Sequence, residues 1–146
     1  MISREQLIKN LNEDSGQRNI RPSLHMWCIL RPSKRRLQNI AKELEVHATE
    51  ELAHALIISK QIDYLGGDQV VTPKPVKTSE KAVEMLRFDL ENETETIRQY
   101  RERVRQCEAL GEFAMAEHIR EILIQEQEHQ IDLATALGED PPDNSG

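Results

Sequence analysis

The chain has 146 residues, with 19 Lys and Arg against 26 Asp and Glu, a net charge of −7 and only 3% aromatic residues. This length suits one domain, and the acidic balance argues against a surface that binds nucleic acid. No apolar run approaches the roughly 20 residues that span a membrane, and the start "MISREQLIKN" lacks the features of a signal peptide. We expect a single cytoplasmic domain over residues 1–146 that has no membrane partner.

The two cysteines, Cys28 and Cys107, have no CxxC spacing and are expected to be reduced thiols. A first short helix is predicted from Ser3, with Gln6 as its capping-box partner. Residues 15–36 then show no helical period and contain one glycine and two prolines, so this segment is predicted to be irregular or divergent.

Three long helices are predicted after this segment, at residues 34–65, about 79–110 and 112–137. Their apolar residues recur at three- and four-residue steps. The members of these seams are Leu37, Ile40, Ala41, Leu44, Ala48, Leu52, Ala55, Ile58 and Ile62, then Val83, Leu86, Leu90, Ile97, Tyr100, Val104 and Cys107, then Met115, Ile119, Ile122, Leu133 and Ala136. The three helices are predicted to end at Gly66-Gly67, Gly111 and Gly138. Residues 138–146 then form a polar tail.

The connection between the first two of these long helices takes about a dozen residues, which is long for a helix bundle. Low aromatic and glycine content favours long helices over a sheet. We therefore predict an all-α four-helix bundle with one long crossover between its second and third helices.

Two Glu-x-x-His pairs stand near the centres of the predicted helices. The stretch "EELAHA" holds Glu51 and His54, and "QEQEH" holds Glu126 and His129. Residues three apart lie on one helix face, so each pair presents oxygen and nitrogen donors to the same side. Such groups are costly to bury unless they are compensated.

A third carboxylate, Glu93, interrupts the apolar seam of the intervening helix. Three carboxylates in a dry core would repel one another, and divalent cations would compensate them. Oxygen and imidazole ligands suit iron, manganese or zinc. A hydrogen-bonded core residue is the plainer interpretation of any lone histidine and is adopted for His25, His47 and His118; the joint arrangement of the two pairs with Glu93 favours a metal site.

Residues 38–137 resemble the bacterioferritin family of the ferritin-like superfamily, and "EMLRFDLENE" is similar to the family's third helix. Di-iron bundles of this kind use one Glu from each of two helices and Glu-x-x-His from the other two. The resemblance implies that Glu51 and Glu126 are the catalytic bridging ligands of two irons, that His54 and His129 are terminal ligands, and that Glu93 shares a metal with His129. It also implies oxidation of Fe(II) by O2 or peroxide, and storage of the ferric mineral in a homo-oligomeric shell of about 24 subunits.

The sequence departs from the family at two positions. Leu52 stands where haem-binding members have methionine, so no haem is predicted. Arg18 stands where the first helix should supply a sixth ligand, a glutamate, and a cation there would oppose metal binding on the His54 side. One hypothesis for this segment is a compensated frameshift, because a reading one nucleotide later can place glutamate at position 18.

The leading interpretation is an iron storage and detoxification protein with a di-iron ferroxidase centre. One alternative is a non-storing di-metal oxidase or peroxidase. Another is a metal-deficient helical assembly protein, which is favoured if Arg18 replaces the first-helix ligand.

Overall fold

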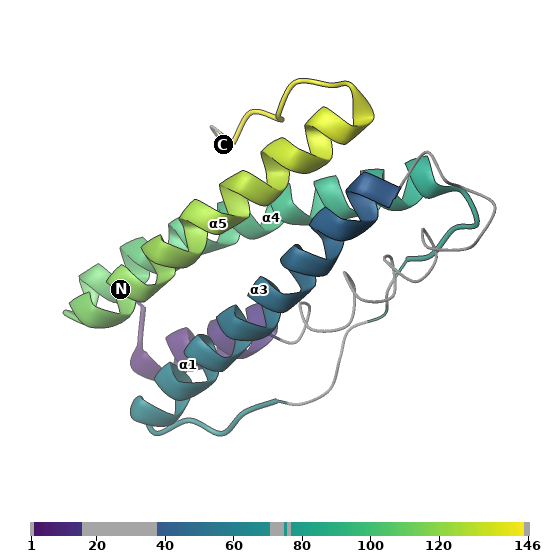
Figure 1. Ribbon diagram of the computed structural model, residues 1–146. Helices are drawn as coiled ribbons and strands as arrows, with labels where there is room; N and C mark the ends of the chain where they lie inside the picture. The colour runs from purple at the N-terminus through teal and green to yellow at the C-terminus, as the bar shows by residue number, and fades with distance from the viewer. Residues whose placement is uncertain (1, 16–37, 71–74, 76, 145–146) are drawn as a thin grey trace.

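The computed structural model describes residues 2–15, 38–70, 75 and 77–144. These residues form four helices, α1 (Arg4–Ser15), α3 (Gln38–Tyr64), α4 (Ala82–Ala109) and α5 (Phe113–Leu137) (Figure 1). The described ranges contain no strand, which agrees with the predicted all-α class. Most of the segment predicted to be irregular, with Arg18, His25 and Cys28, lies outside the described residues.

The helices are arranged as a bundle in which α4 and α5 lie antiparallel along most of their lengths (Figure 1). Helix α3 packs against α5, and the short α1 packs against both α3 and α4. Helices α3 and α4 run in the same direction, so the chain between Tyr64 and Ala82 joins opposite ends of the molecule. The predicted long crossover is therefore confirmed. No helix in the described part of the chain is both long and apolar enough to span a bilayer.

Helix ends follow the predicted signals closely. Gly66, Gly111 and Gly138 have φ angles of 80°, 78° and 72°, which a residue with a Cβ adopts only with strain. Each closes its helix with the same pair of backbone hydrogen bonds, as in Gly67 N–H to Ile62 O at 2.9 Å. These three positions confirm where the long helices stop.

Two apolar clusters divide the interior along the bundle axis. One lies toward the α1 end and comprises Leu7, Leu11, Ile58, Ile62, Leu65, Tyr100, Cys107, Met115, Ala116, Ile119 and Ile122. The other lies toward the opposite end and comprises Ala41, Leu44, Ala82, Leu86, Leu90, Leu133 and Ala134. On α3, α4 and α5 the residues between these clusters include the predicted ionisable positions. The core is therefore apolar at both ends and polar in its middle.

Three predicted seam positions are wrong. Val83 is 54% exposed and Leu52 is 55% exposed, and Ala136 is also exposed. On α4 the buried residue that precedes Leu86 on the core face is Ala82, four positions earlier, and not Val83, three positions earlier. In a helix of 3.6 residues per turn, residues three and four positions apart both lie near the same face. The sequence analysis assigned the residue three positions earlier, Val83, to the buried face.

The capping box predicted at the first helix is half present. The Gln6 backbone N–H donates to Ser3 Oγ at 3.1 Å, but the Gln6 side chain donates to Asn10 instead of returning to Ser3. At the other end of the helix, Asn12 bonds Asp68 O at 2.9 Å and the Val70 N–H at 2.8 Å. Helix α1 thereby holds the beginning of the crossover.

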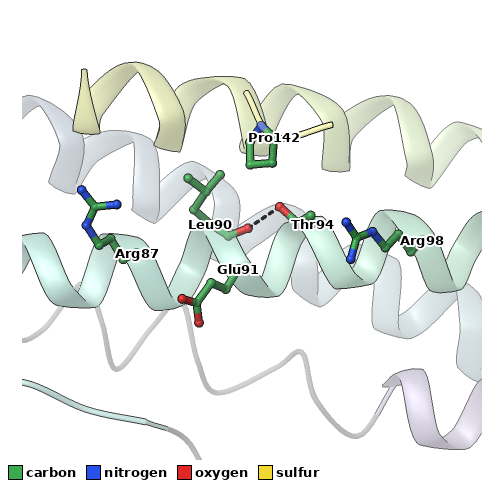
Figure 2. Close-up of a pocket in the computed structure, with 6 residues that line it drawn as sticks. All are labelled: Arg87, Leu90, Glu91, Thr94, Arg98 and Pro142. Atoms are coloured by element: carbon green, nitrogen blue, oxygen red, sulfur yellow. Dashed lines mark hydrogen bonds between the residues drawn. The ribbon is translucent and has the colours of Figure 1, made fainter. Parts of the chain in front are cut away.

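Residues 138–144 of the polar tail fold back over α4 and α5. Asn144 exchanges hydrogen bonds with Gln130 at 2.8 and 3.1 Å, and Gln130 donates to Thr94 Oγ1 at 2.9 Å. Beneath Pro142 this leaves a cavity of about 290 Å³. Figure 2 is a close-up of the side chains that line it. Its lining residues are Arg87, Leu90, Glu91, Thr94, Arg98 and Pro142. None of the predicted ligands lines it.

An ion pair between α1 and α4 generates a stability prediction. Arg103 Nε lies 2.8 Å from Asp14 Oδ2, and the Asp14 side chain is 3% exposed. Arg103→Leu should lower the free energy of unfolding by about 3 kcal/mol, because the buried Asp14 carboxylate loses the guanidinium that it contacts. Urea unfolding followed by circular dichroism measures this change.

Arg105→Leu is the matched control, since the Arg105 side chain is 70% exposed and pairs with Glu102 on its own helix. Arg105→Leu should lower the free energy of unfolding by about 0.5 kcal/mol or less. Equal losses in the two variants would contradict the role given to the Asp14–Arg103 pair.

Candidate metal centre

The polar middle layer contains all five predicted ligands. Helix α3 contributes Glu51 and His54, α5 contributes Glu126 and His129, and α4 contributes Glu93. Glu93 is partly buried, and the other four are at most 3% exposed. The two apolar clusters lie on either side of this layer along the bundle. Buried ionisable groups without compensation would destabilise the fold strongly.

The donor atoms converge on one small region. Glu51, Glu93, Glu126 and His129 each offer one ligand atom, and these atoms all lie within 4.8 Å of one another. His54 adjoins this group, with Nδ1 lying 3.1 Å from Glu126 Oε1 and 3.6 Å from Glu51 Oε1. The structure thus brings together every side chain that the sequence analysis selected.

Glu51 and Glu126 lie between the two histidines. Glu51 Oε1 is 3.6 Å from Nδ1 of both His54 and His129. Glu126 uses its two oxygens separately, with Oε1 toward His54 at 3.1 Å and Oε2 toward His129 at 3.9 Å. A carboxylate placed between two nitrogen ligands can bridge two cations. The arrangement suits a two-metal site better than a single ion.

The centre is not symmetrical. His129 Nδ1 has a third acid, Glu93, at 3.9 Å, whereas the acids that pair with His54 among the described residues are Glu51 and Glu126. The His54 side, which has fewer acids, is the side on which the sequence analysis expects the ligand from the first helix. Position 18 lies outside the described residues.

The carboxylates control the charge of His54. Burial lowers the pKa of this imidazole, but its contacts with Glu126 and Glu51 outweigh burial and raise the pKa to about 9. In the metal-free protein at neutral pH, His54 is therefore an imidazolium among acids. For the neighbouring His47, burial and then His129 lower the pKa, against the opposing effect of Asp132.

The sequence analysis missed two residues that hold the histidines from outside. His129 donates from Nε2 to Glu50 Oε2 at 2.7 Å, and His54 donates from Nε2 to Gln125 Oε1 at 2.5 Å. Gln125 also donates to Glu50 Oε1 at 3.4 Å, which closes a chain of hydrogen bonds between α3 and α5. Because each Nε2 carries the bonded proton, each Nδ1 is directed toward the carboxylates.

A signal for these two residues is visible in the sequence. Glu50 directly precedes Glu51, and Gln125 directly precedes Glu126, within the two stretches already selected. Each residue bonds the histidine of the opposite helix, although a histidine of its own helix follows four residues later. A pattern within one helix does not predict this crossed pairing.

His47, His118 and Cys107 lie in different surroundings from the five predicted ligands. His47 is buried and lies 3.3 Å from Asp132, as expected for a hydrogen-bonded core residue, and half-exposed His118 lies near Glu121. Cys107 is a buried free thiol whose pKa is raised to about 11, chiefly by burial. It belongs to the apolar cluster near α1 and not to the polar layer.

Comparison with known proteins identifies the family. The family model described as a ferritin-like domain matches residues 22–141. The chain belongs to the ferritin-like family. A bacterioferritin from Brucella melitensis biotype 1 is 28% identical over 108 residues, covering 69% of this chain and 67% of that protein. The resemblance predicted from the sequence is confirmed.

Solved ferritin-like structures have the same architecture. A protein from Bacillus anthracis, described as a ferritin-like diiron-carboxylate protein, is 26% identical with a TM-score of 0.81, covering 94% of this chain and 99% of that one. Rhodobacter capsulatus bacterioferritin, described with a metal-free dinuclear site and haem iron, is 24% identical with a TM-score of 0.79, covering 94% and 87%. The predicted ferritin-like four-helix bundle is confirmed.

The raised pKa of His54 predicts how the stability of the metal-free protein depends on pH. The folded pKa of about 9 exceeds the ordinary value of 6.5, so protonated His54 stabilises the fold. This contribution is complete below about pH 6.5 and is lost as the pH rises through 9. The free energy of unfolding should therefore fall by roughly 1 kcal/mol per pH unit over this interval.

Chelator-treated protein unfolded with urea at several pH values measures this slope. His54→Gln should flatten it, and His118→Gln, which replaces a half-exposed histidine of α5, should leave it unchanged. The interpretation fails if the unaltered protein and His54→Gln have the same slope.

Proposed function

We propose that this ferritin-like chain oxidises Fe(II) at a di-iron centre and stores the ferric product in a homo-oligomeric shell. One observation carries the proposal: two acids lie between two inward-directed imidazoles within a buried layer of the bundle. The ligands would be Glu51, His54, Glu93, Glu126 and His129. Manganese and zinc use the same donors and are the other metals to consider.

Each ligand has a distinct role in this proposal. Glu51 and Glu126 would serve both metals, because oxygens of each acid lie close to both histidines. Glu93 and His129 complete the site on one side, and His54 serves the other. Hard carboxylate oxygens favour Fe(III) over Fe(II), which favours the oxidised product. Two Fe(II) ions held there would each supply one electron; with two protons from solvent, the pair of electrons would reduce O2 to hydrogen peroxide or hydrogen peroxide to water.

The protein side chains also control protons and water. His54 holds a proton when no metal is bound, because its pKa is about 9, so its Nδ1 must lose a proton before it can act as a ligand. Glu50 and Gln125 keep the outer nitrogens engaged while Nδ1 faces inward. The apolar clusters at both ends of the layer limit solvent access along the bundle axis.

The relatives support the storage part of the proposal. A bacterioferritin and a diiron-carboxylate protein are among the proteins similar to this chain. Storage needs a closed shell, and a 24-subunit assembly is proposed from the bacterioferritin resemblance. We propose that the protein acts in the cytoplasm and, because Leu52 replaces the haem-ligating methionine, without haem.

Arg18 and the uneven ligand set favour a second candidate function. On the His54 side the described residues provide only the two shared acids, and the sequence places an arginine where a further ligand is expected. A metal-deficient helical assembly protein would have these features. A non-storing di-metal oxidase would keep the centre without forming a closed shell.

Anaerobic Fe(II) titration followed by exposure to air tests these functions. The unaltered protein should bind about two irons per chain and oxidise them rapidly. Glu51→Gln/Glu126→Gln should slow oxidation at least about 100-fold, because both shared ligands lose their charge. Glu45→Gln/Glu128→Gln, which neutralises two exposed acids on the same helices, should behave like the unaltered protein.

Other outcomes would exclude individual functions. Binding of one iron or none, with oxidation no faster than in the doubly substituted centre, would contradict the ferroxidase proposal and support the assembly protein. Rapid oxidation by a species that gel filtration shows to be small would contradict storage and support the non-storing oxidase.

The outer hydrogen bond to His129 gives a separate prediction. Glu50→Ala should weaken metal binding at the centre by about 10- to 100-fold, because His129 loses the acceptor that orients its ring. Glu45→Ala removes an exposed acid from the same helix and should have little effect. Anaerobic isothermal titration with Fe(II) compares the dissociation constants, and equal values in the two variants would contradict an orienting role.

A further inference from the structure

A second group of donor side chains lies beside the candidate centre. Glu43 and His47 of α3 and Asp132 of α5 each offer one ligand atom, and the three atoms lie within 4.8 Å of one another. The group is separate from the five residues assigned to the di-iron centre. It was not predicted, because His47 was interpreted only as a hydrogen-bonded core residue.

The geometry of this group is fixed on its inner side. His47 is 3% exposed, and its ring stacks on His129 with centroids 4.0 Å apart and an interplanar angle of 25°. Its Nε2 lies 3.3 Å from Asp132 Oδ2. Two ligand atoms that share a tetrahedrally bound cation stand about 3.4 Å apart, so this separation suits a shared ion.

The outer side of the group is accessible to solvent. Glu43 is exposed, and the Asp132 side chain is 45% exposed. Glu43 and His47 are four residues apart on α3 and so share one face, while Asp132 approaches from α5. One buried imidazole and two accessible carboxylates form a mixed nitrogen and oxygen donor set with open positions for water.

We propose that Glu43, His47 and Asp132 bind one divalent transition-metal cation. Imidazole and carboxylate ligands suit Fe(II), Mn(II), Co(II) and Zn(II). The two carboxylates supply the negative charge, and the buried histidine fixes the ion near α3 and α5. The stacking of His47 on His129 places this site directly beside the candidate centre. A role in holding iron before it reaches the centre rests on the proposed function, whereas metal binding itself does not.

Equilibrium dialysis with Co(II) under nitrogen tests the proposal, with bound metal counted per chain. Glu43→Gln/Asp132→Asn removes two ligand charges while it keeps the buried imidazole of His47 and leaves an amide oxygen in place of the Asp132 carboxylate that contacts it. This variant should bind about one Co(II) fewer than the unaltered protein, because a single imidazole holds the ion weakly. Glu45→Gln/Glu128→Gln makes the same charge change on exposed positions of the same helices and should bind as much as the unaltered protein.

Equal Co(II) counts in the unaltered protein and Glu43→Gln/Asp132→Asn would overturn the inference, as would an equal loss in the control. Glu51→Gln/Glu126→Gln distinguishes it from the proposed function. If this variant binds as much Co(II) as the unaltered protein and Glu43→Gln/Asp132→Asn binds none, the result supports the second site and contradicts the proposed di-iron centre. If the two variants each lose metal independently, both sites stand.

Discussion

The carboxylates of the middle layer are the constraint on which the structure depends. Glu51 and Glu126 are almost fully buried with Glu93 close by, and such a group requires positive charge nearby. In the metal-free chain His54 supplies one such charge, because both buried acids raise its pKa to about 9. Divalent cations held between Glu51, Glu93 and Glu126 would supply further positive charge, and we take this gathering of buried acids to be the basis of the proposed function.

The three long helices determine where in the bundle the buried acids and histidines lie. On α3, α4 and α5 the polar residues occupy the middle of the element, with apolar residues on either side along the helix. Helices α4 and α5 lie antiparallel, and the long crossover places α3 parallel to α4. This arrangement brings Glu93 close to Glu126 and His129, and brings Glu51 and His54 of α3 to the same region. Glu50 and Gln125 then fix both imidazoles from the opposite side. The candidate site is thus positioned by the length of the helices, by the crossover and by the outer hydrogen bonds.

Periodicity within single helices predicted much of this arrangement. The seams located Glu51, Glu93, Glu126 and His129 at one level, and glycines with positive φ ended the helices where expected. Contacts between helices were not predictable in the same way. The crossed bonds of Glu50 and Gln125, and the contact of His47 with Asp132, depend on the rotation of α3 relative to α5. The choice between a three- and a four-residue step likewise misplaced Val83, for which the structure substitutes Ala82.

The most direct test of the account is anomalous X-ray diffraction from crystals soaked anaerobically in Fe(II), with data collected on both sides of the iron absorption edge. The account predicts two iron peaks between His54 and His129, each within bonding distance of Glu51 and Glu126. Absence of iron from this layer, with His54 still paired to Glu126 and Glu51, would contradict the claim that the buried carboxylates form a metal centre.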